Sequence, residues 1–392
     1  MILLLDIGAS RIKACSIENN AVIDSLSVPS PSLNNHSRQS GHYTIPAELY
    51  RTAIHELLNK LYNHQVTGVY VCTEMHGVLV DNTYISWKDS RAKIDKQQAQ
   101  KFLEITGMQL RPGIAYASLE HDKIQNTVIG TLLDTFLDGP AENTNISLAA
   151  SLGLVNKHTQ QYSHDLLHNK ISAISVNTKL PIGTVTIHGQ CLPVYGGIGD
   201  LQSALLGSQL GQLVDAVINL GTGSQVVCTT DSIENYEIRP MPDGSYVKVI
   251  THIPCGRALS ILAEKFGEKR FWRAWQSLEP LQILTTDPNQ AQLSFFESAW
   301  QYSAESGYVK FKENQSFEEL VAGIAHSWSL QYVRALNMLD TNFEKQRVAL
   351  SGGLSHRSPF LIPVLTAYTN RKFVYCDTVT GEETLDGLLR LQ

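Results

Sequence analysis

Apolar positions in the first part of the chain change from strand-like to helix-like spacing and back. Residues 2–26 contain apolar runs that are broken at Gly8 and at the polar residues 18–20, which predicts three strands joined by tight turns. Residues 46–63 begin with a proline and place leucine and isoleucine side chains at helical spacing, so they predict a helix. Residues 66–77 then predict a buried strand. The chain therefore opens as a β-meander that leads into β/α units.

The second half of the chain repeats this order. The segments 191–200, 216–230 and 244–253 again have a strand-turn-strand character. Residues 317–339 predict a long helix, and residues 347–370 predict a strand followed by a helix. Both halves run from β-hairpins into β/α units, although no repeat is detectable by residue identity. This layout is expected of a duplicated two-domain ATPase, with the second domain beginning near residue 189.

Composition narrows the class of function. The chain has 392 residues, of which 43% are apolar and 17% charged, as in a well-buried globular protein. Its formal charge of −6 is spread out and no run of lysine and arginine occurs, so neither nucleic acid nor an anionic membrane is indicated as a partner. Small-molecule chemistry is the better expectation.

Targeting signals and cysteine usage indicate a cytoplasmic protein. The apolar run before Asp6 is too short for the core of a signal peptide, and no later run approaches the roughly 20 residues of a membrane span. The six cysteines are scattered singly, without the spacing of zinc ligands. We therefore expect reduced thiols in the cytoplasm.

The first candidate site is the loop that contains Asp6, Gly8, Ser10 and Lys13. The sequence has neither a GxxxxGK[ST] loop nor a complete GxGxxG motif, so P-loop and Rossmann sites are not supported. Asp6 ends a buried strand beside a glycine turn whose N–H groups and Ser10 hydroxyl could meet phosphate oxygens. A carboxylate in that place could also hold hydrated Mg²⁺. The alternative is an ordinary hairpin in which Asp6 and Gly8 serve only the turn.

A second glycine-rich loop follows the strand at residues 216–220. It contains Gly221, Thr222 and Gly223, and its glycine content exceeds what a chain reversal needs. Two such loops could hold a triphosphate between them. A simple turn remains the alternative, because the motif is weak by itself.

Asp200 is the candidate catalytic carboxylate. It follows Gly196, Gly197 and Gly199 and precedes an apparent helix. Glycines allow a substrate to approach the backbone closely, and a helix start can hold a carboxylate ionised. The alternative is that Asp200 is only a helix cap.

A third cluster combines an aromatic side chain with polar groups. Glu74, Met75 and His76 end one predicted strand, and Trp87 and Asp89 follow about ten residues later. Sugars bind to such combinations because their C–H faces stack on tryptophan while their hydroxyls need polar partners. The alternative is a tryptophan that belongs to the core.

The last candidate segment contains Gly352 and Gly353 after a strand, with Ser358 opening the next helix. A backbone without side chains at this turn could lie against a planar adenine. A flexible β–α connection is the alternative.

In this order and at these separations, the segments resemble the FGGY family of carbohydrate kinases, relatives of hexokinase and actin. The matching stretches are DIGASRIK, EMHG, SWKDSR, GIGD, INLGTGSQ, ALSGGLSHRSPFL and the closing EETLDGLLRL. The resemblance covers nearly the whole chain. It implies an α/β fold of two actin-like (ribonuclease H-like) lobes with an ATP and sugar cleft between them. Residues 1–188 would carry the sugar side and the first phosphate loop, and residues 189–392 the catalytic aspartate, the second phosphate loop and the adenosine motif.

The resemblance also implies roles for individual residues. Asp200 would be the general base, and Asp6 with Asp200 would hold Mg²⁺. Met75, His76, Trp87, Asp89 and Asp200 would face the sugar. The residues that would contact ATP are Asp6, Gly8, Ser10, Lys13, Gly221, Thr222, Gly223, Gly352, Gly353 and Ser358.

Within the family, the sequences GDLQSALLGS, NLGTGSQVV and SWKDSR are most similar to sedoheptulokinases and xylulokinases. This likeness implies an ATP- and Mg²⁺-dependent kinase that phosphorylates a primary hydroxyl of a ketose such as sedoheptulose or xylulose, with a homodimer as a candidate assembly. Three features depart from the family pattern: Ala9 replaces the usual threonine, residues 129–152 lack the usual polar groups, and the second half is short. They leave open a sugar- or nucleotide-binding sensor with weakened catalysis. A third hypothesis is another ATPase of the actin and chaperone superfamily, which would lack the sugar-type cluster.

Overall fold

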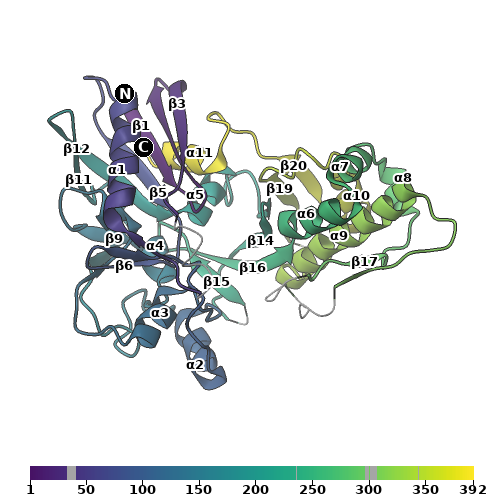
Figure 1. Cartoon of the computed structure of the whole chain (residues 1–392), viewed down its shortest axis with the longest axis horizontal. Helices are drawn as coiled ribbons and strands as arrows, with labels where there is room; N and C mark the ends of the chain where they lie inside the picture. Colours follow the sequence, from purple (N-terminus) through teal and green to yellow (C-terminus); the bar gives the residue numbers. More distant parts are fainter. Residues whose placement is uncertain (33–40, 235, 296–299, 301–306, 343) are drawn as a thin grey trace. The chain divides into compact units, whose positions relative to one another are not determined.

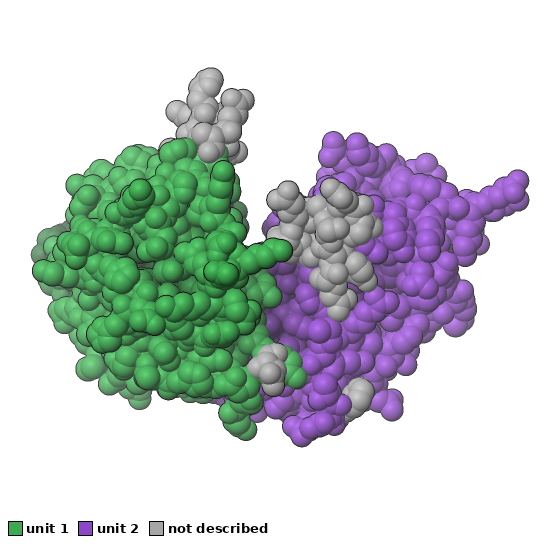
Figure 2. Space-filling model, turned by 90° about the horizontal axis from the view of Figure 1, so that it is seen from below, with its two compact units in different colours: residues 1–207, 231–247, 378–392 green, residues 208–230, 248–377 purple. Residues whose placement is uncertain are grey.

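The computed structural model describes residues 1–32, 41–234, 236–295, 300, 307–342 and 344–392. They form two compact units, coloured separately in Figure 2. The first unit comprises residues 1–207, 231–247 and 378–392, and the second comprises residues 208–230 and 248–377. The units therefore do not follow the single division at residues 188 and 189 that the sequence predicted. The reason is that strand pairing and helix packing join segments far apart in the sequence.

The first unit is built on a six-stranded sheet of order β11-β12-β5-β1-β2-β3. Its strands are β1 (Ile2–Ile7), β2 (Arg11–Glu18), β3 (Ala21–Pro29), β5 (Val69–Thr73), β11 (Gly183–Ile187) and β12 (Gln190–Gly199). β1 pairs antiparallel with β2 and parallel with β5, and β5 pairs parallel with β12. The predicted meander at residues 2–26 is thereby confirmed.

Helices cover both faces of this sheet (Figure 1). α1 (Ala47–Leu61), predicted from the spacing of its apolar residues, packs against β2, β3 and β11. α5 (Asp200–Gly207) and α11 (Glu383–Leu389) contact β1, β5 and β12 and pack closely on each other. Their close approach depends on glycine, because a Cβ on Gly387 would lie only 1.8 Å from the carbonyl oxygen of Ser203.

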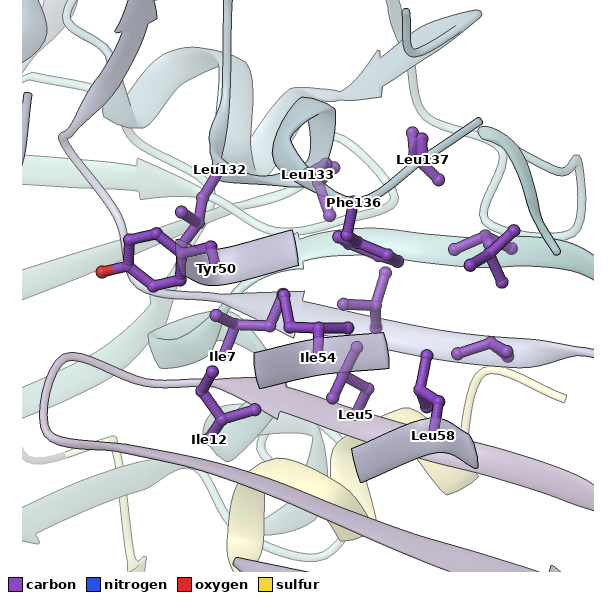
Figure 3. Packing of buried hydrophobic residues seen from close by; sticks show 14 of the residues in the cluster. Leu5, Ile7, Ile12, Tyr50, Ile54, Leu58, Leu132, Leu133, Phe136 and Leu137 are labelled. Atoms are coloured by element: carbon purple, nitrogen blue, oxygen red, sulfur yellow. The ribbon is translucent and has the colours of Figure 1, made fainter. Parts of the chain in front are cut away.

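Side-chain alternation along β1 divides the core of this unit into two layers. Leu5 and Ile7 point into the cluster formed with α1, which Figure 3 shows together with Ile54 and Leu58. Leu4 lies in the other cluster, with side chains of α11. Successive strand residues face opposite sides, so Asp6 shares the α11 side with Leu4. The register of this one strand thus buries Asp6 beside the C-terminal helix.

Smaller elements complete the first unit. A four-stranded sheet has the order β4-β7-β6-β8, and β9 and β10 form a parallel pair. The remaining elements are β4 (Thr44–Pro46), β6 (Val78–Val80), β7 (Thr83–Ile85), β8 (Ile129–Gly130), β9 (Asn143–Asn145), β10 (Ala173–Ser175), β15 (Glu237–Pro240), α2 (Lys96–Thr106), α3 (Ala115–Asp122), η2 (Leu132–Thr135) and α4 (Ile146–Ser151).

The second unit is built on the sheet whose full order is β15-β16-β14-β13-β19-β20. Its strands are β13 (Ala216–Leu220), β14 (Gly223–Thr230), β16 (Tyr246–Pro254), β19 (Arg347–Ser351) and β20 (Lys372–Tyr375), with β17 (Ala291–Gln292) and β18 (Tyr308–Val309) as a separate pair. Its helices are α6 (Gly256–Phe266), α7 (Glu268–Gln276), α8 (Pro280–Leu284), α9 (Phe317–Leu339) and α10 (Leu361–Thr369). α9 confirms the predicted helix, and Ser316 with Glu319 closes its N-terminus as a capping box.

The two large sheets share a topological core. β13 pairs antiparallel with β14 and parallel with β19, as β1 does with β2 and β5. In the two registers Asp6 lies opposite Cys72, and Asn219 lies opposite Ser351. The structure thus confirms the repeated layout that the patterning predicted.

Within the described part of the chain, every helix is too short or too polar to cross a membrane.

Candidate active site

Asp6 lies near the end of β1 and is almost completely buried. The hydroxyl of Thr384, in α11, donates a hydrogen bond of 2.7 Å to its Oδ2, and the Cys72 thiol lies 3.7 Å from Oδ1. Burial raises the pKa of Asp6, and the hydrogen bond from Thr384 and the charge of Lys13 oppose this rise. Asp6 is therefore a desolvated carboxyl, held by a residue 378 positions away, rather than a surface turn residue.

Asp200 is the first residue of α5, directly after β12. The strand is irregular between Gly196 and Ile198, and Gly196 and Gly197 have positive φ, which a glycine adopts without strain. The backbone N–H of Leu201 donates to Asp200 Oδ1 at 2.7 Å. Burial, together with the negative charges of Asp6 and Glu74, raises the pKa of Asp200 to about 7. At neutral pH this carboxyl can therefore take up or release a proton.

The sheet brings these two acids to the same edge. β1 and β12 both run parallel to β5, and the register places Asp6 opposite Cys72 and Gly199 opposite Thr73. Side chains after the carboxyl ends of adjacent parallel strands share one edge of the sheet, where α/β folds commonly bind ligands. The sequence placed Asp6 and Asp200 in different domains, whereas the structure joins them in the first unit.

The pair has the chemistry of a magnesium site. Mg²⁺ prefers carboxylate oxygens, keeps several of its waters and is commonly bound through one or two carboxylates. Among the described residues no group of three or more His, Cys, Asp or Glu is arranged to hold a metal. Asp6 and Asp200 supply two carboxylates that could bind a hydrated ion, and a cation here would offset the repulsion that raises the pKa of Asp200.

The remaining groups of the first loop lie at the β1–β2 turn. The N–H of Gly8 donates to the Arg11 carbonyl at 3.1 Å, and Ser10 is exposed. The ammonium of Lys13 lies 2.6 Å from Glu382 Oε2. Lys13, which the sequence predicted to contact phosphate, is thus paired with a carboxylate of the C-terminal segment.

In the cluster that the sequence predicted to bind a sugar, the Trp87 side chain is half-exposed and its indole N–H is held by a hydrogen bond. Its indole N–H donates a hydrogen bond of 3.0 Å to Oε2 of Glu74, which is buried. Burial raises the pKa of Glu74, and the charge of Lys88 opposes the rise. Lys88 itself donates to the carbonyl oxygen of Ala9 at 2.6 Å. This lysine therefore links the Trp87 loop to the β1–β2 turn.

Met75 lies beside the residue before Asp200, and His76 lies near the charge of Arg239. The Met75 sulfur would lie 2.6 Å from a Cβ placed on Gly199, so it packs beside the residue before Asp200. His76 has a positive φ of 75°, and its Nδ1 lies 2.8 Å from the Ser151 carbonyl oxygen. Burial and the charge of Arg239 lower the pKa of His76 to about 4, so its ring is neutral near pH 7.

The Asp89 carboxylate is buried and is bonded to other groups of the protein. It accepts hydrogen bonds from the Arg91 side chain at 2.9 Å and from the Tyr43 backbone N–H at 2.9 Å. Arg91 in turn binds Asp122 at 3.0 Å. These contacts account for Asp89 as the residue that orders the loop carrying Trp87.

The second glycine loop lies within the second unit. Gly221 and Thr222 connect β13 to β14, and their carbonyl oxygens accept hydrogen bonds from the N–H groups of Gly256 and Arg257, at 3.1 and 2.8 Å. Thr222 and Gly223 are exposed. The loop is therefore fixed from behind by the start of α6, with its hydroxyl available to solvent.

In the segment predicted to contact adenosine, one glycine has open space beside it and the serine is buried. Gly352 has a φ of 84°, and a Cβ there would meet the Leu220 carbonyl at 2.7 Å, whereas a Cβ on Gly353 would meet nothing within 4 Å. Ser358 is completely buried and accepts a hydrogen bond of 3.0 Å from the Trp275 indole. Open backbone thus exists at Gly353, while the Ser358 hydroxyl is used inside the unit.

Three residues around Asp6 were not predicted to belong to the site. Glu382 and Thr384 lie in the closing stretch that resembles the family's final helix, and Lys88 lies inside the Trp87 motif. The charged residues of both stretches can be seen in the sequence. The contacts of Lys13 with Glu382 and of Asp6 with Thr384 span 369 and 378 residues, and they follow only from the packing of α11 on β1.

Solved structures similar to this chain are carbohydrate kinases. The ligand-bound xylulose kinase from Lactobacillus acidophilus has a TM-score of 0.82 at 16% identity, and covers 99% of this chain and 88% of that one. A gluconate kinase from Lactobacillus acidophilus has a TM-score of 0.79 at 16% identity, covering 99% and 88%. Plasmodium falciparum glycerol kinase with ADP has a TM-score of 0.78 at 15% identity, covering 100% and 89%.

Among curated proteins, an apulose kinase from Pectobacterium atrosepticum is 26% identical in an alignment of 276 residues that covers 59% of this chain. The matched stretch spans 55% of that kinase, about half of its length. No protein-family model matches the chain. The structural likeness confirms the predicted fold class: the chain has the α/β fold of these carbohydrate kinases.

Proposed function

We propose that this protein is an ATP-dependent carbohydrate kinase in which Asp200 removes the proton from a sugar hydroxyl as that hydroxyl attacks the γ-phosphate. The observation that carries the proposal is the position of Asp200, at the start of α5 beside the buried Asp6, with a pKa raised to about 7. A general base works best when its pKa lies near the operating pH. An aspartate that served only as a helix cap would not need this second carboxyl beside it.

Phosphoryl transfer requires positioning and charge neutralisation more than covalent chemistry from the protein. Asp200 accepts the hydroxyl proton, and the Leu201 N–H keeps its carboxylate in place. Asp6, fixed by Thr384, together with Asp200 would hold Mg²⁺, which supplies charge neutralisation at the phosphates when bound. The exposed Thr222 hydroxyl and the glycine turns around it are suited to phosphate oxygens of ATP.

The Trp87 side of the first unit supports a sugar as the substrate. A half-exposed indole anchored by Glu74 offers a rigid apolar face to the C–H groups of a sugar. The xylulose kinase and apulose kinase similarities, together with the resemblance of GDLQSALLGS and SWKDSR to ketose kinases, favour a small ketose phosphorylated at a primary hydroxyl.

An ADP-coupled assay across a sugar panel tests the proposal. The panel contains xylulose, ribulose, sedoheptulose, apulose, fructose, glycerol and erythritol, each with ATP and Mg²⁺. We expect sugar-dependent ADP release with at least one ketose, and none from Asp200→Asn. Asp165→Asn, which removes an exposed carboxylate distant in sequence from the site, is the matched control and should retain full activity.

Two results would contradict the proposal. Measurable ATP binding without ADP release from any sugar would favour the sensor hypothesis. ADP release that no sugar stimulates would favour an ATPase of another kind.

A further inference from the structure

Two lysines lie near the β1–β2 turn, Lys13 within β2 and Lys88 in the segment after β7, and their surroundings differ. Lys13, the predicted phosphate group, has its ammonium 2.6 Å from the carboxylate of Glu382, and both side chains are partly exposed. The ammonium of Lys88 lies 2.6 Å from the carbonyl oxygen of Ala9. Among the described residues no carboxylate lies within ion-pair distance of Lys88. Lys13 therefore forms a close ion pair, whereas Lys88 acts on the carboxylate of Glu74 only from beyond ion-pair distance.

The contacts of Lys88 leave part of its ammonium available. An ammonium has three N–H donors, and the Ala9 carbonyl accepts one of them. The aromatic rings of Tyr43 and Trp87 lie 5.2 and 5.8 Å from Lys88 Nζ. Ring faces attract a cation but leave strong hydrogen-bond donors without acceptors. Lys88 is thus held in place with donors to spare, between the turn that follows Asp6 and the Trp87 platform.

From this geometry we infer that Lys88 is a phosphoryl-binding residue, whose ammonium contacts the terminal phosphate of ATP and the same phosphoryl group as it moves to the sugar. The inference rests on the proposed function and assigns a further catalytic residue to that site. During transfer, negative charge is spread over the three equatorial oxygens of the phosphoryl group. A preplaced ammonium stabilises that charge, and no bond to Lys88 forms or breaks.

The position of Lys88 also suits the direction of transfer. Trp87 would contact the acceptor sugar, and the turn at Ala9 follows the Asp6 carboxylate. A side chain that touches both places lies where an acceptor oxygen and a transferred phosphorus would meet. Lys13, by contrast, is expected to fix the C-terminal segment through Glu382.

The inference is tested with Lys88→Met, which keeps most of the length of the side chain but removes its charge, and with Lys88→Arg, which keeps the charge. Lys93→Met, at an exposed lysine five residues further on, is the matched control. Affinities for ADP and for the non-hydrolysable analogue AMP-PNP are measured by calorimetry, alongside kcat for the best sugar of the panel and the thermal midpoint. AMP-PNP carries a terminal phosphate that ADP lacks, so the difference between the two affinities measures the contribution of that phosphate.

We expect Lys88→Met to weaken AMP-PNP about 10-fold or more, to leave ADP affinity unchanged and to lower kcat about 100-fold, with Lys88→Arg and Lys93→Met close to wild type. Equal weakening of both nucleotides, or an unchanged kcat, would overturn the inference while leaving the proposed function intact. A lower thermal midpoint in Lys88→Met with unchanged nucleotide affinities would assign Lys88 a purely structural role and also overturn it. If wild-type protein binds neither nucleotide, the proposed function and this inference fail together.

Discussion

The β1–β2 hairpin of the first unit and the β13–β14 hairpin of the second occupy the same place in their sheets. In each, the first strand pairs antiparallel with the next strand and parallel with a strand from a later β/α unit. At the matching position the first hairpin has Asp6, hydrogen-bonded to Thr384, and the second has Asn219, which donates to Ser351 at 3.1 Å. The same backbone is therefore combined with a buried carboxyl in one unit and a neutral amide in the other.

Under the proposed function, this difference separates two tasks of phosphoryl transfer. A carboxyl beside Asp200 can hold a cation by its charge and support proton transfer, whereas an amide carries no charge and takes up no proton near neutral pH. The acidic first hairpin is thus suited to the chemical step. The neutral second hairpin, with the exposed Thr222, is suited to binding phosphate without repelling it.

The largest expected effect comes from exchanging the two residues. Asp6→Asn makes the first hairpin neutral like the second, and we expect kcat to fall by about 10²–10⁴-fold, because the charge that holds the metal is lost. Asn219→Asp adds a carboxylate to the second hairpin and should instead weaken ATP binding by repelling the phosphates. Steady-state kinetics at several Mg²⁺ concentrations measures both. Comparable kcat losses in the two variants would remove the proposed division of tasks.

Asp340 of the second unit and Asp200 of the first should change the stability of the protein with pH in opposite directions. In the second unit Asp340 is buried with Arg371 at 2.9 Å, and although burial alone would raise its pKa, hydrogen bonds from the Lys345 and Glu344 N–H groups and from Arg371 lower it. A lowered pKa contributes stability that is present above the ordinary value of about 3.9 and is lost as the pH falls through the folded-state pKa. Asp340→Asn should therefore cost about 3–5 kcal/mol at pH 7.

The raised pKa of Asp200 has the opposite consequence. Its penalty is absent below about pH 3.9 and is complete once the pH has risen past the folded-state value of about 7. Asp200→Asn is therefore expected to raise the thermal midpoint at pH 8 by at least about 2 °C and to change it little at pH 4. Calorimetric scans at the two pH values check both carboxyls. A destabilised Asp200→Asn at pH 8 would contradict the description of Asp200 as a desolvated acid.

A further pair of variants distinguishes the hydrogen bonds behind the two hairpins. Thr384→Val removes the donor to a buried carboxyl, and we expect a loss of about 1.5–3 kcal/mol together with a higher Mg²⁺ requirement. Ser351→Ala removes a bond between neutral groups and should cost about 0.5–1.5 kcal/mol without changing the Mg²⁺ dependence. Denaturant unfolding and Mg²⁺ titration measure the pair. Equal Mg²⁺ dependence in both variants would show that Thr384 does not position a metal-binding group.

Sequence patterning predicted the elements well where the pattern is local. The meander at residues 2–26, the helix behind Pro46 and the helix at residues 317–339 follow from apolar spacing and capping residues. The placement of residues 190–207 and 378–392 in the first unit could not be predicted, because it depends on β12 pairing with β5 and on glycine contacts between α5 and α11.

The site shows the same limit. Asp6, Asp200 and Trp87 were identifiable from residue type and turn context, and the structure gives all three positions in the first unit. Glu382, Thr384 and Lys88 are recognisable only once their partners Lys13, Asp6 and Ala9 lie beside them. Ser358 and Asp89 illustrate the reverse, since a tertiary contact with Trp275 and a local contact with Arg91 use the groups that the motifs suggested for ligands.

The most direct test of the account is the turnover of Asp200→Asn, measured with the best sugar of the panel beside nucleotide affinity in the same preparation. The substitution keeps the shape of the side chain but removes the acceptor of the hydroxyl proton. We expect sugar-dependent ADP release to fall by about 10²–10⁴-fold, with the affinity for AMP-PNP nearly unchanged. Retained turnover in Asp200→Asn would contradict the assignment of Asp200 as the base.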